Sequence, residues 1–393
     1  MSLSFALPRL ARAGMELGSR TGADDALHEI DRLLRRPGLA TQLELSHGER
    51  PGSVTLRLSP SCADWLAPDG DTLGLAQRVG LDGVRRARDL ELEIVLAMLL
   101  APAPLRFATA AELASALRVR AEIVHAARET RLDFETKTAE RPAEFVYDEE
   151  RGFLLRPGCS LIEALELATQ PRLAGRRYSF SCWRATEYVL LLAVTREARA
   201  QHPELAARLA RQAERRALKG AAFDRVFLEP HGSTTAPLPT RYYVPGDRTW
   251  FRNPDPVSSA VAGFEGSYTF YLGAGGFADF WRDDRVESFA GKCLTLFYWR
   301  MAVVRDAAGE PRVDEGRVGA LVERALANPP EARRVLTLME RVQDAPQRFF
   351  GGCIDPTRDH VRTLTPGACE VHLPDGDERV APRPSAPVVV TPR

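Results

Sequence analysis

Apolar residues recur along the chain with two different periods, and the helical period dominates its middle part. ATAAELASALRVRAEIVHAAR repeats apolar residues at helical spacing. Thr109 and Glu112 form a capping box that predicts where this helix begins, and Ser160 and Glu163 do the same before SLIEALELA. Further helices are predicted at ALHEIDRLLRR, DLELEIVLAMLL, WRATEYVLLLAVTREA, PELAARLARQAERRALKG, VGALVERALA and EARRVLTLMERVQ.

Alternating stretches predict strands elsewhere. LATQLELS and GSVTLRLS flank a turn near the N-terminus, and FVYDEERGFLL predicts a hairpin around DEERG. After residue 220 strands are predicted at FDRVFLEP, RYYV, RTWFRNP, GSYTFYLG and KCLTLFYWRMAVV, with turns at PGD, NPDP and GAGG. Helices followed by an antiparallel sheet predict an α+β fold.

Changes in these patterns divide the chain into four segments. Residues 1–88 mix strand and helix, and residues 89–305 form the main helical and then β-rich part. Residues 306–380 form a C-terminal extension with further helices. Residues 381–393 are proline-rich without apolar periodicity, which predicts a disordered tail.

Composition narrows the class of protein. The 393 residues are 45% hydrophobic and 27% charged, an ordinary soluble globular composition. Lys plus Arg and Asp plus Glu both number 53, so no overall field attracts nucleic acid. No apolar run approaches the roughly 18 residues of a membrane span, and arginines interrupt the N-terminal stretch, unlike a secretory signal. We therefore expect a cytoplasmic protein with no nucleic-acid partner and no membrane span.

Six cysteines lie far apart, with no C-x-x-C and no histidine pair at metal spacing. This pattern argues against a structural zinc site and against a disulfide framework. No D-x-[DN]-x-[DN]-G loop is present, so neither calcium dependence nor a cofactor is expected.

Cys182 in YSFSCWRATEY stands where a helix is predicted to begin. The unpaired amides and the dipole of a helix N-terminus favour the thiolate, which predicts a depressed thiol pKa and the most reactive of the six cysteines. The competing interpretation is a small hydrophobe packed in the core. Cys159 in RPGCS also precedes a capped helix, whereas Cys293 is predicted inside a strand and is most simply a core residue.

Several of these motifs occur in one order over residues 89–303: AELASALRVRAEIVHAAR, the FVYDEERGFLL hairpin, YSFSC before a helix, FDRVFL, PGD…F-x-NP and Y-L-G. This order resembles the small calcium-independent transglutaminases of spore-forming bacteria, the protein-glutamine γ-glutamyltransferase family. The resemblance implies a papain-like α+β core in which Cys182 attacks glutamine side chains of a protein acyl donor. It also implies a lysine acyl acceptor, and a location in the cytoplasm or in spore or cell-surface layers.

The chain departs from that family at two positions. The family has a glutamate directly before its cysteine and a second one after a strand glycine, where this chain has Ser181 and Ser267. Glu265 lies two residues before Ser267, so in an extended segment it faces the same side and is the favoured replacement base. Asp247, in the PGD that the family shares, and His231, in a polar loop, are the other candidates.

Two further features have simpler interpretations. Glu187 lies about 140° around the helix from Cys182, so it is expected to pair with Arg184 on the helix surface. LGAGGF lacks the Lys-Ser/Thr of a phosphate loop and predicts a tight turn.

Three functions are therefore compatible with the sequence. The first is calcium-independent transfer of glutamine acyl groups to lysine, forming isopeptide crosslinks through a cysteine thioester. The second is a cysteine deamidase or amidase of the same core, in which water replaces lysine. The third is a non-catalytic binding or structural protein, which the serines at the two glutamate positions favour.

Overall fold

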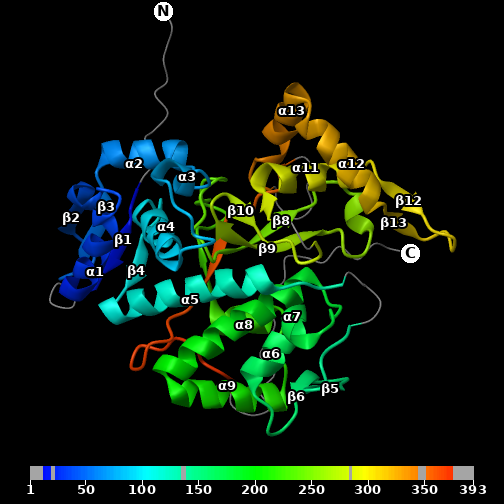
Figure 1. Cartoon of the computed structure of the whole chain (residues 1–393), viewed down its shortest axis with the longest axis horizontal. Coiled ribbons are helices and arrows are strands. Elements are labelled where there is room, and N and C mark those ends of the chain that lie inside the picture. Colours follow the sequence, from blue (N-terminus) through cyan, green and yellow to red (C-terminus); the bar gives the residue numbers. More distant parts are fainter. Residues whose placement is uncertain (1–11, 19–22, 134–138, 283–285, 344–350, 375–393) are drawn as a thin grey trace, which may run out of the picture.

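The computed structural model describes residues 12–18, 23–133, 139–282, 286–343 and 351–374. Helices pack with sheets whose strand pairings are mostly antiparallel, which confirms the predicted α+β class (Figure 1). The predicted tail at 381–393 lies outside the described residues. Within the described part, we find no helix with the length and apolar content needed to cross a membrane.

The N-terminal part is a four-stranded sheet with the strand order β2-β3-β1-β4. β1 pairs antiparallel with β3 and parallel with β4, so a strand beyond residue 88 belongs to this sheet. The strands and the helices around them are β1 (Met15–Leu17), α1 (Ala23–Arg35), β2 (Leu43–His47), β3 (Val54–Leu58), α2 (Pro60–Leu66), α3 (Leu75–Val79), α4 (Ala87–Leu99) and β4 (Leu105–Phe107).

A helical layer follows, and its helices begin where the capping signals predict. The Thr109 hydroxyl accepts from the Glu112 N–H at 3.2 Å, and Ser160 accepts from the Glu163 N–H at 3.4 Å. The predicted hairpin is present and packs beside this layer. The elements are α5 (Ala110–Glu129), β5 (Phe145–Asp148), β6 (Gly152–Leu155), α6 (Leu161–Thr169), α7 (Pro171–Ala174), α8 (Cys182–Gln201) and α9 (Pro203–Arg215).

The main sheet has six strands in the order β11-β10-β9-β8-β14-β7, and all of its pairings are antiparallel. β14 comes from the C-terminal extension and lies between β7 and β8. The strands are β7 (Leu228–His231), β8 (Arg248–Arg252), β9 (Gly266–Gly273), β10 (Gly276–Phe277), β11 (Glu287–Ser288) and β14 (Arg358–Val361).

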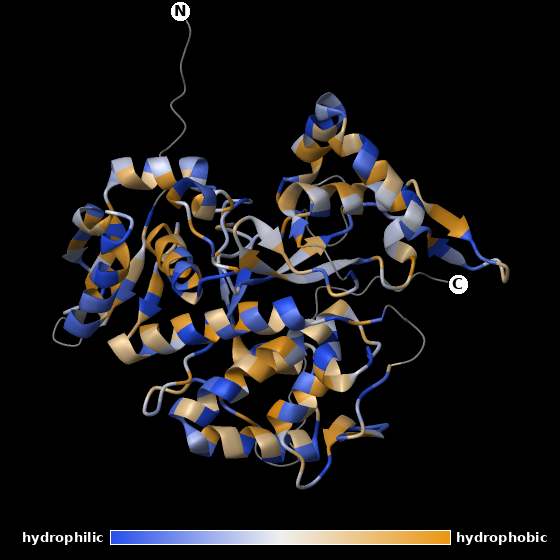
Figure 2. Cartoon of the chain, viewed as in Figure 1, coloured by the Kyte–Doolittle hydropathy of each residue, from blue (hydrophilic) through white to orange (hydrophobic). Residues whose placement is uncertain are grey.

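Strand β9 separates two hydrophobic cores because its side chains alternate between the faces of the sheet. Phe270 and Leu272 pack in the core that contains α5 and α8, while Tyr271 packs in the core of the C-terminal helices. Figure 2 shows the apolar residues of α8 gathered in the middle of the helical layer. The C-terminal elements are α11 (Phe289–Trp299), β12 (Val303–Arg305), β13 (Pro311–Val313), α12 (Glu315–Leu326) and α13 (Pro329–Met339).

Three strand predictions are wrong or partly wrong. KCLTLFYW forms helix α11 instead of a strand, so Cys293 is a core residue on a helix. FDRVFLEP splits into helix α10 (Ala221–Phe227) and strand β7, and RYYV forms no strand although Tyr242 and Tyr243 are fully buried. Short apolar runs carry no period that distinguishes a buried helix from a buried strand.

A buried arginine joins the C-terminal extension to the main sheet. Arg248 on β8 is 2% exposed and donates to Asp359 on β14 at 2.8 and 2.9 Å and to Asp224 on α10 at 2.8 Å. A buried cation of this kind depends on its carboxylates, because its own desolvation is costly.

Removing one of these carboxylates should therefore destabilise the fold. We expect Asp359→Asn to lower the free energy of unfolding by about 1–3 kcal/mol, measured by urea denaturation. The control is Glu331→Gln, which breaks the exposed pair between Glu331 and Arg334 and should have little effect. Equal losses in the two variants would contradict a structural role for the buried pair.

Candidate active site

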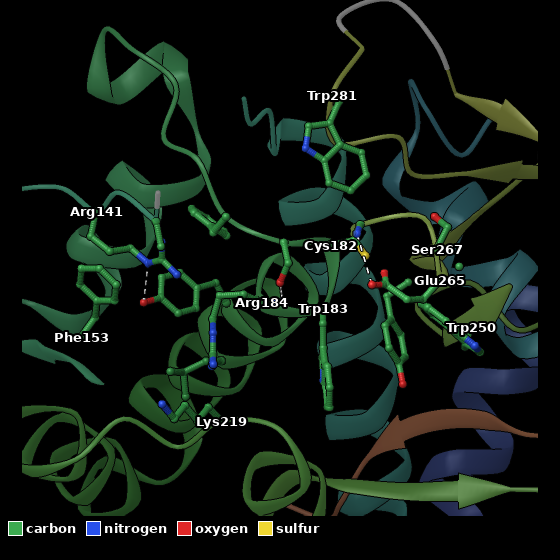
Figure 3. Close-up of a pocket in the computed structure, with 18 of the residues that line it drawn as sticks. Arg141, Phe153, Cys182, Trp183, Arg184, Lys219, Trp250, Glu265, Ser267 and Trp281 are labelled. Atoms are coloured by element: carbon green, nitrogen blue, oxygen red, sulfur yellow. Dashed lines mark hydrogen bonds between the residues drawn. The ribbon is translucent and has the colours of Figure 1, made fainter. Parts of the chain in front are cut away.

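A cavity of about 880 Å³ lies between the helical layer, the start of β9 and helix α11 (Figure 3). Cys182, Glu265 and Ser267 lie together in it, and Arg141, Phe153, Arg184 and Lys219 lie away from them (Figure 3). Its lining includes Arg141, Phe153, Phe180, Cys182, Trp183, Arg184, Tyr188, Lys219, Trp250, Glu265, Gly266, Ser267, Tyr268, Asp279, Arg282, Glu287, Lys292 and Glu315.

Cys182 is the first residue of helix α8, as the sequence predicts. Ser181 is the N-cap, and its hydroxyl accepts from the Arg184 N–H at 3.3 Å. Serine is a better N-cap than glutamate, so the residue at this position serves the helix start. The cysteine is partly exposed and lines the cavity.

The predicted depression of the thiol pKa is corrected by the structure. Burial raises the pKa of the Cys182 thiol above its ordinary value. The backbone N–H of Tyr268, the Lys292 ammonium and the backbone N–H of Trp183 lower this pKa, while the negative charge of Glu265 raises it. Because desolvation is the largest of these effects, Cys182 is a neutral thiol near pH 7.

Aromatic rings fix the start of α8 against β9. The Trp183 ring stacks on Tyr268 with centroids 5.7 Å apart, and Trp250 covers Tyr268 at 4.5 Å. A Cβ on Gly266 would clash with the Trp250 indole, so the chain requires glycine here. These contacts hold the helix start at the edge of the strand that carries the other candidate residues.

Glu265 and Ser267 lie beside Cys182 in this cavity (Figure 3). Glu265 directly precedes β9, is exposed, and accepts from the Gly263 N–H at 3.3 Å. The negative charge of Glu265 raises the pKa of the Cys182 thiol. Ser267 is buried and carries only a hydroxyl, so Glu265 is the carboxylate at the start of β9 that lines this cavity.

Asp247 is not brought to Cys182. Its carboxylate is buried, accepts from Arg120 at 2.7 Å and from the Val244 N–H at 2.8 Å, and thereby fixes the PGD turn. Among the described residues, Asp247 is not one that lines the cavity.

His231 is also away from the thiol, at the end of β7. It borders a second cavity of about 560 Å³ between β7, β14 and α5, and its Nε2 lies 3.0 Å from the Ala103 carbonyl oxygen. Burial lowers the pKa of His231, so the ring is neutral at pH 7. The structure therefore places neither His231 nor Asp247 beside Cys182.

The predicted pair of Arg184 and Glu187 is present, but its carboxylate is not on the surface. Glu187 is 2% exposed and also accepts from the Gly220 N–H at 2.6 Å. Burial raises the pKa of Glu187 to about 7, although Arg184 and the Gly220 N–H both lower it.

Sequence reasoning missed Lys292, whose segment it predicted as a strand. Lys292 lies on α11, is 7% exposed, and lines the cavity near Cys182. No motif marks this residue. Its position depends on α11 packing across the sheet, which a single sequence does not reveal.

A half-buried arginine packs on aromatic rings of the cavity lining. The Arg141 guanidinium lies 3.9 Å from the Phe180 ring centroid and 4.7 Å from that of Phe153, and donates to the Tyr188 hydroxyl at 2.9 Å. Cation–π contacts therefore hold the guanidinium against these aromatic faces.

All six cysteines are free, and the Sγ atoms of Cys293 and Cys353 lie 3.7 Å apart in the C-terminal core. Cys159 is partly exposed and lies outside the cavity lining. Within the described ranges, no group of three or more His, Cys, Asp or Glu side chains could hold a metal ion.

The chain thus has an α+β fold in which a cysteine at the start of a largely buried helix lies in one cavity with a carboxylate that directly precedes a strand. The family model of protein-glutamine gamma-glutamyltransferase matches residues 77–283, just over half of the chain. The chain belongs to this family, an acyltransferase family.

A solved transglutaminase structure from Geobacillus stearothermophilus, without its C-terminal extension, is 19% identical to this chain, with a TM-score of 0.36. The match covers 54% of this chain and 96% of that one. No curated protein matches the chain.

The raised thiol pKa predicts how Cys182 reacts with an alkylating agent. Thiolate appears only as the pH rises through the pKa, so iodoacetamide labelling of Cys182 should be slow at pH 7. Its rate should climb with a midpoint above about 8.5. Peptide mass spectrometry over a pH series measures this, with buried Cys293 and Cys353 as unlabelled internal controls. A midpoint below about 8.5 would contradict the dominance of desolvation.

Proposed function

We propose that this protein is a calcium-independent protein-glutamine γ-glutamyltransferase that forms isopeptide crosslinks. The observation that carries the proposal is the placement of Cys182 and Glu265 in one cavity of a chain that belongs to the transglutaminase family. Family membership supports acyl transfer, and the cavity supplies a nucleophile and a base. The acyl donors would be glutamine side chains of proteins and the acceptors lysine side chains.

In the first half-reaction the Cys182 sulfur attacks the glutamine carboxamide carbon. Because the thiol is neutral at rest, a base must take its proton as the C–S bond forms, and we assign this role to Glu265. The proton then passes from Glu265 to the leaving nitrogen, the C–N bond breaks, and ammonia departs. The product is a γ-glutamyl thioester on Cys182.

In the second half-reaction a neutral lysine amine attacks the thioester carbonyl. Glu265 takes a proton from the nitrogen as the C–N bond forms, and the C–S bond breaks to release the sulfur, which regains a proton. Backbone N–H groups at the start of α8 are suited to stabilise the oxyanion in both half-reactions. The net change converts an amide and an amine into an isopeptide and ammonia.

The six free cysteines support a reducing compartment, and we keep the cytoplasm as the proposed location. A reduced Cys182 is also a condition of the mechanism, since a disulfide at this sulfur would remove the nucleophile.

Replacement of Glu265 tests the assignment of the base. Glu265→Gln keeps the shape and removes the base, so it should lower incorporation of a fluorescent primary amine into a glutamine-rich protein by about 10²-fold. The assay is run without calcium, and thermal unfolding confirms that the variant is folded. Ser267→Ala should cost much less, because a hydroxyl is not a base near neutral pH.

Cys182→Ala is the control and should abolish incorporation. Full incorporation by Glu265→Gln would remove Glu265 from the mechanism. Release of ammonia by the wild type without amine incorporation would identify a deamidase instead of a transferase.

A further inference from the structure

Lys292 is an unusual residue for its surroundings. It is 7% exposed on helix α11, and lysine is seldom this buried without a partner. Within the described residues no carboxylate lies within ion-pair distance of its ammonium. The side chain instead lines the cavity that contains Cys182.

The charges around this end of the cavity come from several elements. Glu265 precedes β9, and Asp279 is paired with Arg282 at 3.7 Å. Glu287 on β11 and Glu315 on α12 also line the cavity. Of these groups, Lys292 and Glu265 act on the Cys182 sulfur with opposite signs.

We propose that Lys292 is the cation that stabilises negative charge on the Cys182 sulfur and on the adjacent tetrahedral intermediate. As the proton moves from the sulfur to Glu265, negative charge moves from the carboxylate to the sulfur. A fixed ammonium in a desolvated cavity favours that transfer. The catalytic part of this assignment rests on the proposed function, while the effect on the thiol does not.

The test compares a variant that removes the Lys292 charge with one that keeps a positive charge at this position. In Lys292→Met the midpoint for iodoacetamide labelling of Cys182 should rise by about one pH unit or more, and Lys292→Arg should return it toward the wild-type value. Lys219→Met is the matched control: Lys219 lines the same cavity, is not among the charges acting on Cys182, and should leave the midpoint unchanged.

Amine incorporation is then measured for the same variants. We expect at least a tenfold loss in Lys292→Met and substantial recovery in Lys292→Arg. An unchanged labelling midpoint in Lys292→Met, or unchanged incorporation, would overturn the proposal. Labelling needs no acyl donor, so a shifted midpoint in a protein with no incorporation would reject the proposed function and leave the effect on the thiol intact.

A separate observation concerns the basic residues as a set. Only three of the 53 are lysine, namely Lys137, Lys219 and Lys292, and the other 50 are arginine. Lys219 and Lys292 line the cavity, and Lys137 lies outside the described residues. The described surface away from the cavity therefore carries its positive charge as guanidinium groups.

The use of arginine in place of lysine matters for an enzyme that transfers acyl groups to amines. A lysine amine becomes nucleophilic when it loses its proton, whereas arginine stays protonated in proteins and is not an acyl acceptor. We infer that the replacement of lysine by arginine makes the chain a poor acceptor for its own acyl groups. This second inference also rests on the proposed function.

The inference is tested by adding lysines to the surface. Arg35, Arg85 and Arg172 have side chains 75%, 86% and 74% exposed, so Arg→Lys at all three keeps charge and adds three accessible amines. With a biotinylated glutamine peptide as donor, this variant should acquire severalfold more label than the wild type, at the new lysines. The matched control has glutamine at the same three positions and should match the wild type.

An external lysine peptide in the same reactions separates the two possible failures. If the lysine variant labels that peptide but not itself, the self-protection inference is overturned. If no protein labels the peptide, the proposed function fails and this inference fails with it.

Discussion

The packing of helix α8 against strand β9 is the constraint on which the site depends. The helix is buried along most of its length, so its direction is set by the core and its first residue must emerge where the helix meets the strand. The stack of Trp183 on Tyr268, and the glycine that lets Trp250 approach, fix this junction. A cysteine at the helix start and a carboxylate before the strand are thereby brought into one cavity.

Desolvation of the Cys182 thiol then determines its protonation state. The cavity makes the resting thiol neutral, in contrast to the activation that a helix N-terminus alone would provide. Activation therefore depends on a base that acts during the attack, and on charges that favour the thiolate. Glu265 and Lys292 act on the same sulfur with opposite charges. In the proposed mechanism Glu265 accepts the proton and Lys292 stabilises the negative charge left on the sulfur.

Local signals predicted much of this arrangement. The caps at Thr109 and Ser160 gave the helix starts, and the placement of Cys182 at the start of α8 followed from the pattern around it. The alternation rule predicted Glu265 on the side of Cys182, and the two residues line one cavity.

The errors come from contacts between residues distant in sequence. Asp247 is a carboxylate in a motif shared with the family, but it forms a buried ion pair with Arg120 on α5. The α11 segment is apolar on nearly every side, so its hydrophobic residues show no helical period and Lys292 was missed. The thiol pKa was predicted from the helix start alone, and the burial that reverses its direction is a property of the assembled cavity.

Intact-mass analysis of the acyl-enzyme tests the central claim most directly. The protein is incubated with a glutamine donor peptide in the absence of amines and quenched in acid, and the modified residue is located by peptide mapping. The account predicts an adduct of the donor mass less ammonia on Cys182, released by hydroxylamine. An adduct on another residue, or no adduct on Cys182 while the donor is consumed, would contradict it.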